Sequence, residues 1–258
     1  MQELYLQTKH GKIWCAVYGQ GKKSTPLVVV HGGPGFPSMP EVVSDLASDR
    51  PVYFYDQLGS GCSERAKDAS IYTANHYVDE LEEVIKVLGL LEFILLGFSW
   101  GSGLVTAFAI NKRPKGLKGL ILSGPLLSAP LWVNDQRKNM EALPRDVLKV
   151  IEVCEKNNDF GEVYQEAMMA YYHLFIYRSD SWPSSLLMAG EQINPDVYLS
   201  MWGPSEFTVT GNLKTFIKTM VSLKFHCQDD LNDFIEVESD NFSNGFRGYS
   251  RSGYNERH

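Results

Sequence analysis

The sequence lacks the cysteine spacings that metal sites and disulfide frameworks require. Its four cysteines are scattered along the chain, at Cys15, Cys62, Cys154 and Cys227. Structural zinc sites and small disulfide-stapled domains use closely spaced or paired cysteines, and neither pattern is present. We therefore expect no bound metal ion, no organic cofactor and a reducing compartment.

Basic runs and long apolar runs are also missing. The net charge is −7, without a cluster of lysines or arginines, which argues against nucleic acid as the main partner. Residues 1–4 have no basic segment followed by an apolar stretch, and no later stretch is long enough to span a bilayer. We expect a cytoplasmic protein that binds no membrane, and the sequence carries no signal for its oligomeric state.

What the sequence does contain is a nucleophile motif in the right local context. Residues 93–96 are an unbroken apolar run typical of a strand buried on both faces, and residues 104–110 read as an apolar helix. Between them stands Gly97-x-Ser99-x-Gly101. Strand, sharp turn and helix together predict a strained elbow that presents the Ser99 hydroxyl clear of the backbone. The alternative is a tight turn with a structural serine.

Strands and helices alternate through the first half of the chain. Four segments have the composition of buried strands: Leu27–Val30, Val52–Tyr55, residues 93–96 and residues 120–122. Thr73 is a candidate N-cap for an amphipathic helix that ends at Gly89, and a hairpin is expected before residue 19. This alternation predicts an α/β fold with a mostly parallel sheet covered on both faces. The loops at the carboxyl ends of its strands should share one edge with Ser99.

From residue 126 the pattern becomes helical and rich in aromatic and methionine side chains. The apolar positions with helical spacing are Val147, Leu148, Ile151 and Val153, then Val163, Ala167, Ala170, Tyr171 and Leu174. They indicate either a helical packing interface or a lid whose inner face shapes an apolar pocket, and both can hold. We expect a core at residues 1–125, a lid at 126–205, and a second part of the core at 206–258 that ends in a divergent, disordered tail.

Four motifs in this order resemble the proline iminopeptidase family of serine aminopeptidases, which have the α/β-hydrolase fold. They are His31-Gly32-Gly33-Pro34-Gly35, Asp56-Gln57-x-Gly59-x-Gly61-x-Ser63, Gly97-x-Ser99-Trp100-Gly101 and Met201-Trp202-Gly203-Pro204-Ser205-Glu206-Phe207. The resemblance covers residues 4–218. It implies peptide substrates with a free N-terminus, and release of an N-terminal proline or small apolar residue.

The resemblance also implies roles for particular residues. Ser99 would be the acylating nucleophile, and the backbone N–H groups of Trp100 and Gly33 would form the oxyanion hole. Glu206 would hold the free α-amino group of the substrate, since a buried carboxylate opposite an ammonium selects N-terminal residues. His31 is interpreted as a structural loop residue, because the base histidine of this fold follows the serine in the chain.

The resemblance stops before the triad is complete. The family carries its Asp in a Gly-x-x-Asp-x-x-x-Pro loop and its His near the C-terminus, and neither motif is present, so the triad Asp and His are unassigned. His226 and His258 do not match, and Asp229, Asp230, Asp233 and Asp240 are interpreted as solvated charges. We expect incomplete C-terminal strands, poor stability, and turnover about 10⁴–10⁶-fold below that of a complete triad.

One hypothesis explains the divergent tail as a change of reading frame. Read from the third base of the Thr219 codon, residues 219–228 permit Asp-Gly-Leu-Leu-Glu-Ile-Ser-Leu-Pro, which is the family's pattern at this point. The alternative is a Gly/Ser/Tyr/Arg segment with a binding role of its own.

Three functions remain open at the level of sequence. The first is the serine aminopeptidase; the second is an esterase or lactonase of the same fold; the third is a non-catalytic relative that binds small amphiphiles under its lid. Glu206 discriminates among them, because only an aminopeptidase needs an anchor for an ammonium group.

Overall fold

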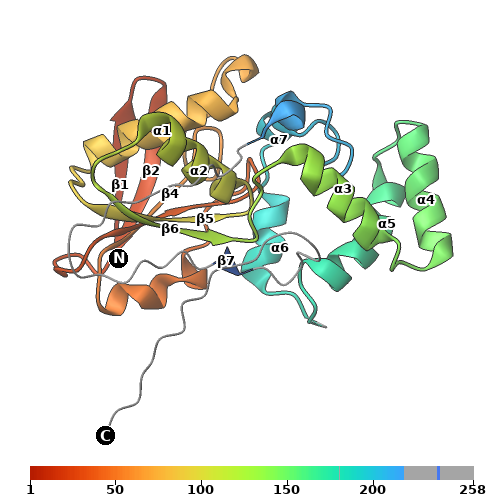
Figure 1. Cartoon of the computed structure of the whole chain (residues 1–258), viewed down its shortest axis with the longest axis horizontal. Helices are drawn as coiled ribbons and strands as arrows, with labels where there is room; N and C mark the ends of the chain where they lie inside the picture. Colours follow the sequence, from red (N-terminus) through yellow and green to blue (C-terminus); the bar gives the residue numbers. More distant parts are fainter. Residues whose placement is uncertain (180, 218–236, 239–258) are drawn as a thin grey trace, which may run out of the picture.

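A seven-stranded sheet forms the centre of the protein, in the order β1-β2-β4-β3-β5-β6-β7 (Figure 1). The computed structural model describes residues 1–179, 181–217 and 237–238. The strands are β1 Gln2–Thr8, β2 Gly11–Tyr18, β3 Leu27–Val30, β4 Val52–Tyr55, β5 Phe93–Phe98, β6 Leu117–Ser123 and β7 Val237–Glu238. β1, β2 and β4 pair antiparallel, and the pairs β4–β3, β3–β5, β5–β6 and β6–β7 are parallel. The predicted α/β fold with a mostly parallel sheet is confirmed.

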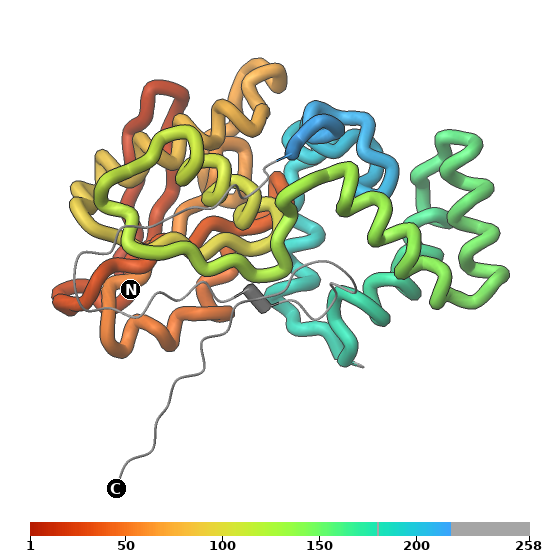
Figure 2. The backbone as a smooth tube through the Cα atoms, viewed as in Figure 1, coloured from red at the N-terminus to blue at the C-terminus, as the bar shows by residue number. Residues whose placement is uncertain are grey.

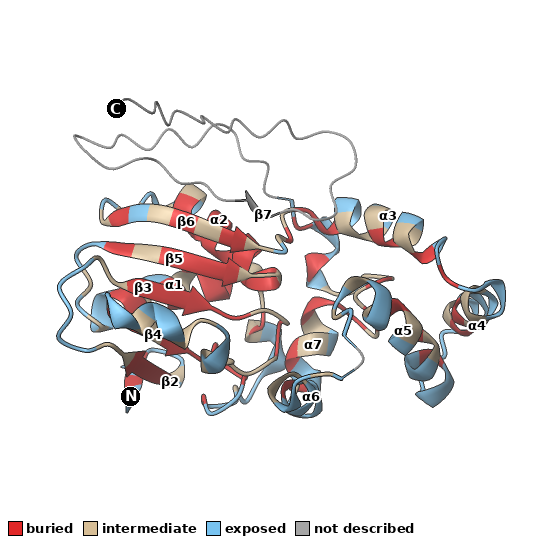
Figure 3. Ribbon diagram, turned by 90° about the horizontal axis from the view of Figure 1, so that it is seen from below, coloured by how far each residue is buried: buried red, intermediate tan, exposed pale blue. Residues whose placement is uncertain are grey.

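The unbroken apolar runs form the central strands because both of their faces are covered. All four residues of β3 are buried, and Val29 lies opposite Phe54 of β4 and Leu96 of β5 (Figure 3). Alternate side chains point to opposite faces, so Val28 and Val30 join the larger core with α1 (Ala74–Val87) and α2 (Trp100–Lys112). Ser99, which directly follows β5, therefore lies at an edge that is packed on both sides.

Local signals place the helices of this half as predicted. The Thr73 hydroxyl accepts a hydrogen bond from the His76 N–H at the start of α1, and Gly89, just after α1, has a positive φ of 66°. Residues 42–47 contribute to two 3₁₀ segments. The 3₁₀ segments of the chain are η1 Pro40–Val42, η2 Ser44–Ser48, η3 Ala69–Ile71 and η4 Asn212–Thr215.

Five helices follow β6 and lie at one end of the sheet (Figure 2). They are α3 Ala129–Met140, α4 Arg145–Lys156, α5 Glu162–Phe175, α6 Ser184–Glu191 and α7 Pro195–Met201. Between residues 129 and 201 the described chain contains no strand, as the sequence predicts. Part of this region has a hydrophobic core of its own, in which Ile151, Met168, Tyr171 and Phe207 are buried.

The buried face of α4 and α5 includes only part of the apolar positions expected from the spacing: Ile151 and Tyr171 are buried as predicted. Val153, Val163 and Leu174 are 48%, 59% and 44% exposed, whereas Tyr164 and Tyr171 are buried. Tyr164, Met168 and Tyr171 have the same helical spacing as the aliphatic positions. The stripe with the larger side chains is the buried one, because the free energy gained scales with the apolar area removed from water.

At the end of the sheet, where incomplete C-terminal strands are expected, the described residues contain the two-residue β7, which pairs with Leu122 and Ser123. His226, His258 and the rest of the tail lie outside the described residues. In the part of the chain that the structure describes, no helix is long and apolar enough to cross a membrane.

Candidate active site

Ser99 occupies a strained turn between β5 and α2. Its backbone has φ 49° and ψ −116°, a combination that costs free energy for any residue with a Cβ atom. The turn is held from the side of β6, because the Ser99 N–H donates to the Ser123 carbonyl at 2.9 Å. The Ser99 carbonyl accepts from the Leu126 N–H at 3.3 Å. The predicted strand–turn–helix geometry and strained backbone at Ser99 are confirmed.

The two glycines of the motif are required by space. A Cβ atom on Gly97 would lie 2.5 Å from the carbonyl oxygen of Gly101, and one on Gly101 would lie 2.2 Å from that of Val30. Both distances are below any tolerated contact, and both involve backbone that cannot move freely. The turn can therefore be this tight only with glycine on each side of the serine.

Two backbone N–H groups beside Ser99 have no acceptor. Neither the Gly33 N–H nor the Trp100 N–H donates a hydrogen bond to any atom of the residues that the structure describes. Gly33 has φ 114°, and its carbonyl accepts from the Trp202 indole at 2.9 Å. Trp100 begins α2, whose N-terminus adds positive potential. These two N–H groups are the ones that the sequence analysis assigns to an oxyanion hole.

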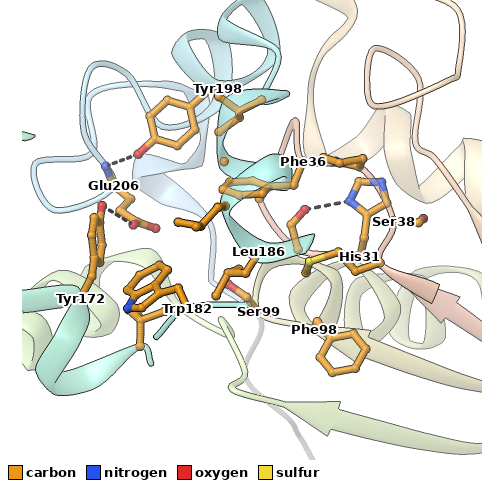
Figure 4. Close-up of a pocket in the computed structure, with 18 of the residues that line it drawn as sticks. His31, Phe36, Ser38, Phe98, Ser99, Tyr172, Trp182, Leu186, Tyr198 and Glu206 are labelled. Atoms are coloured by element: carbon orange, nitrogen blue, oxygen red, sulfur yellow. Dashed lines mark hydrogen bonds between the residues drawn. The ribbon is translucent and has the colours of Figure 1, made fainter. Parts of the chain in front are cut away.

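His31 is buried and saturated with hydrogen bonds. Its Nε2 accepts from the Gln57 N–H at 3.0 Å, so the ring proton is on Nδ1, which faces the Gly32 carbonyl at 2.8 Å (Figure 4). Burial lowers the pKa of His31, which keeps the ring neutral. These contacts agree with the structural role predicted for His31.

A cavity of about 780 Å³ lies between the sheet edge and the helices (Figure 4). Its floor includes Gly32, Gly33 and Ser99, and most of its wall is apolar or aromatic. The helical region contributes Met169, Tyr172, Ile176, Trp182, Leu186 and Leu199, among others. The interpretation of this region as a lid over Ser99 is consistent with the arrangement, and so is its packing role, because Met168 and Tyr171 lie in its core instead.

Glu206 lines the same cavity and carries an unpaired carboxylate. Within the described chain no lysine, arginine or histidine lies within ion-pair distance of it, and its one side-chain partner is the Tyr172 hydroxyl at 3.4 Å. Its backbone is held by the Tyr198 hydroxyl and the Trp132 indole, at 3.1 and 3.2 Å. Burial raises the pKa of Glu206 from 4.5 to about 7.

Among the described residues no imidazole contacts Ser99. His31 is committed to the loop, His76 lies 3.6 Å from Glu80 in α1, and His173 accepts from the Trp182 indole. Three of the residues singled out from the sequence, Ser99, Gly33 and Glu206, line one cavity. Trp100 follows Ser99 in the chain, and its side chain is buried in the core. The triad Asp and His remain unassigned.

The sequence analysis missed the residues that hold these groups. Tyr172, Tyr198 and Trp132 surround Glu206 from three separate helices, and no local pattern marks them. Gln57 belongs to a motif that was identified, but without a role. Its contacts with His31 and Trp100 become visible only in the folded chain.

A strained serine at the carboxyl end of a parallel sheet, in a cavity that a helical region also lines, is the arrangement of α/β hydrolases. In agreement, the profile of the α/β hydrolase fold family matches residues 25–221. The proline iminopeptidase of Heyndrickxia coagulans is 39% identical over 217 residues, which are 83% of this chain and 75% of that protein.

Solved structures also resemble this chain. The crystal structure of VinJ has 31% sequence identity and a TM-score of 0.78, over 84% of this chain and 76% of that one. The proline iminopeptidase of Mycobacterium smegmatis has 28% identity and a TM-score of 0.74, with the same coverage of 84% and 76%. The chain belongs to the proline iminopeptidase family of α/β hydrolases.

Proposed function

We propose that this chain is a serine aminopeptidase, which transfers the N-terminal residue of a peptide to Ser99 and releases it by hydrolysis. The observation that supports the proposal best is the unpaired Glu206 carboxylate in the cavity that also contains Ser99. A charge without a partner in a largely apolar wall is costly for the free protein. A ligand with an ammonium group supplies the missing partner.

Ser99 would act as the nucleophile. Its oxygen attacks the first peptide carbonyl while its proton passes to a base, and the carbonyl oxygen becomes an oxyanion. The free N–H groups of Gly33 and Trp100 are available to receive that charge. Collapse of the intermediate breaks the C–N bond and protonates the departing amine, and water then cleaves the ester on Ser99. Among the described residues, none makes the hydrogen bond to the Ser99 hydroxyl that this base would make.

Recognition of the amine is coupled to the protonation of Glu206. With a pKa of about 7 the carboxyl group is only partly ionised at neutral pH, and an ammonium held beside it would favour the charged form. The affinity for a free α-amine should therefore rise with pH through about 7. It should fall again only when the amine of the substrate loses its own proton.

The cavity wall favours a small apolar residue at the N-terminus. Trp132, Tyr172, Trp182 and Tyr198 line it with aromatic rings. Rings exclude water from the site, and their faces attract a cationic nitrogen and the carbons beside it. A prolyl residue at the N-terminus offers both a cationic nitrogen and adjacent apolar carbons, since its ring carbons flank its ammonium group.

The test compares three substrates: proline arylamide, N-acetylproline arylamide and an aryl ester without an amine. We expect kcat/KM for the free amine to exceed that of the blocked amide by roughly 30-fold to several thousand-fold, which corresponds to about 2–5 kcal/mol. Ser99→Ala should abolish turnover, and a fluorophosphonate should label Ser99 in the wild type.

The other outcomes favour the alternatives. Equal rates with and without the amine, together with fast ester cleavage, would favour an esterase. A protein that binds prolinamide but neither reacts with the fluorophosphonate nor turns over any substrate would favour a non-catalytic binding protein.

A further inference from the structure

Gln57 lies between the two segments that supply the free N–H groups. It is the second residue after β4. In the sheet, β4 is separated from β5 by β3, which leads into the loop at residues 31–35. The side chain of Gln57 reaches across β3 to the elbow after β5. It is almost completely buried, with 1% of its surface exposed.

Both ends of the Gln57 amide are used. Its Nε2 donates to the His31 carbonyl at 3.0 Å, and its Oε1 accepts from the Trp100 indole N–H at 2.9 Å. A carbonyl only accepts and an indole only donates, so the two partners fix the orientation of the amide. Of the common side chains of this size, only an amide can satisfy both partners at once.

The link from Gln57 to the Gly33 N–H runs through His31, which Gln57 holds twice. The Gln57 side chain donates to the His31 carbonyl, the contact that a substitution removes, and the Gln57 backbone holds the His31 ring. The Gln57 backbone N–H donates to His31 Nε2, which leaves the proton on Nδ1 to be donated to the Gly32 carbonyl at 2.8 Å. The Gly32 carbonyl and the Gly33 N–H belong to one planar trans peptide, in which they point in opposite directions. Fixing this carbonyl therefore aims the Gly33 N–H.

The link to the second N–H group is shorter. The Trp100 indole is bonded to Gln57, and the ring is fully buried against Phe216 and Tyr77, with centroids 5.6 and 6.2 Å away. Holding this ring fixes the first residue of α2, whose backbone N–H is the other free donor. One buried amide thus contacts both sides of the site.

We propose that Gln57 is a positioning residue that sets the spacing and direction of the Gly33 and Trp100 N–H groups for an oxyanion. This inference rests on the proposed function, because an oxyanion forms only if Ser99 is acylated. It predicts that changes at Gln57 weaken the binding of a tetrahedral adduct and spare the binding of the free amine, which contacts Glu206 elsewhere in the cavity.

The experiment uses two probes on the full chain. The boronic acid analogue of proline accepts the Ser99 oxygen at boron, the hydroxyl proton passes to solvent, and a boron-bound oxygen takes the oxyanion position. Pyrrolidine has the same cyclic ammonium group but no carbonyl, so it binds without forming a tetrahedral centre. Dissociation constants for both are measured by calorimetry with the wild type, Gln57→Leu, Gln57→Glu and Ser99→Ala.

We expect Gln57→Leu to weaken the boronic acid about 10–100-fold and pyrrolidine less than about twofold. Complete removal of one oxyanion donor costs about 10²–10³-fold, and here both donors remain but are misaligned. Gln57→Glu keeps the acceptor for Trp100 and loses the donor to His31, so it should weaken the boronic acid as well. Gln57→Glu also provides the test of the inference if Gln57→Leu does not fold.

The matched control is Gln136→Leu. Gln136 is also a buried amide, which accepts from Tyr171 and Asn139 inside the helical region and does not line the cavity. This variant should bind both probes like the wild type, so that a general loss of stability is separated from a positioning effect.

Three results would overturn the inference. Unchanged boronic acid affinity in both Gln57 variants would show that the amide positions nothing, and equal weakening of both probes would show a general structural role. If Ser99→Ala binds the boronic acid as tightly as the wild type, the proposed function fails, and the role of Gln57 fails with it.

Discussion

The two walls of the cavity treat their polar groups differently. At the sheet edge the Asp56 carboxylate has a partner for each oxygen: it accepts from the Ser38 and Cys62 N–H groups at 2.7 and 2.8 Å. The His31 ring and the Gln57 side-chain amide also have hydrogen-bond partners. On the side of the helices, the Glu206 carboxylate has one long contact to a tyrosine.

The difference separates scaffold from binding site. A buried polar group with all its partners rigidifies the chain around it. The bonded side chains of His31, Asp56 and Gln57 thus hold the loops beside the Ser99 hydroxyl and the two N–H groups, which have no partner among the described residues. A buried charge without a partner destabilises the free protein. Such a charge is a feature to expect where a ligand of opposite charge binds.

The largest effect is expected from a single methyl group placed at the sheet edge. In Gly101→Ala the new Cβ would lie 2.2 Å from the Val30 carbonyl oxygen, in backbone that belongs to two packed elements. We expect a loss of about 3 kcal/mol or more in the free energy of unfolding, measured by urea denaturation.

The control for this prediction lies in the helical region. Gly190→Ala in α6 would meet no atom within 4 Å, and alanine favours the helix over glycine by up to about 1 kcal/mol. Equal tolerance of both substitutions would show that the sheet edge is not rigid, and would remove the contrast between the two walls.

The next effect is a pH-dependent gain of stability in Glu206→Gln. The folded pKa of about 7 is above the ordinary 4.5, so between these values the native state holds a proton that the unfolded chain has released. Wild-type stability therefore decreases as pH rises through this window. The variant should be equal to the wild type at pH 4 and more stable by about 2–3 kcal/mol at pH 8.

The same measurement on Glu166→Gln provides the reference, because Glu166 is exposed on α5. Its unfolding free energy should follow the wild type across the whole range. A Glu206→Gln curve that also stays parallel to the wild type would show that the Glu206 carboxylate is solvated or paired.

A smaller effect is expected from Tyr172→Phe. The Tyr172 hydroxyl is 3.4 Å from the Glu206 carboxylate and lowers its pKa, against the effect of burial. Without it, the pH at which prolinamide binding becomes tight should move upward, with a loss of about 1 kcal/mol at pH 7. Calorimetric titration at several pH values checks this, and an unchanged profile would mean that the contact carries no free energy.

The sheet edge was predictable from the sequence because its signals are local. The run at residues 93–96, the glycines on either side of Ser99 and the strand before His31 each specify their own conformation. Parallel strands then bring the ends of those segments together without further information. The strained turn and the position of the loop at residues 31–35 follow from this.

The wall formed by the helices was not predictable in detail. Trp132, Tyr172 and Tyr198 come from α3, α5 and α7, and they meet at Glu206 only through helix packing. On α5 two stripes with the same periodicity compete, and the buried one is decided by side-chain volume and by partners such as Ser205, which contacts the Tyr164 hydroxyl at 2.8 Å. Periodicity alone carries no such information.

The most direct test of the account is the effect of Glu206→Gln on two substrates that share one leaving group. Proline arylamide has the free amine, and N-acetylproline arylamide does not; both are cleaved at the same bond. We expect the variant to lose roughly 30-fold or more in kcat/KM on the free amine, equivalent to about 2 kcal/mol at least, and to be unchanged on the blocked substrate. An equal loss on both substrates would contradict the account, because Glu206 would then support the structure and not bind the amine.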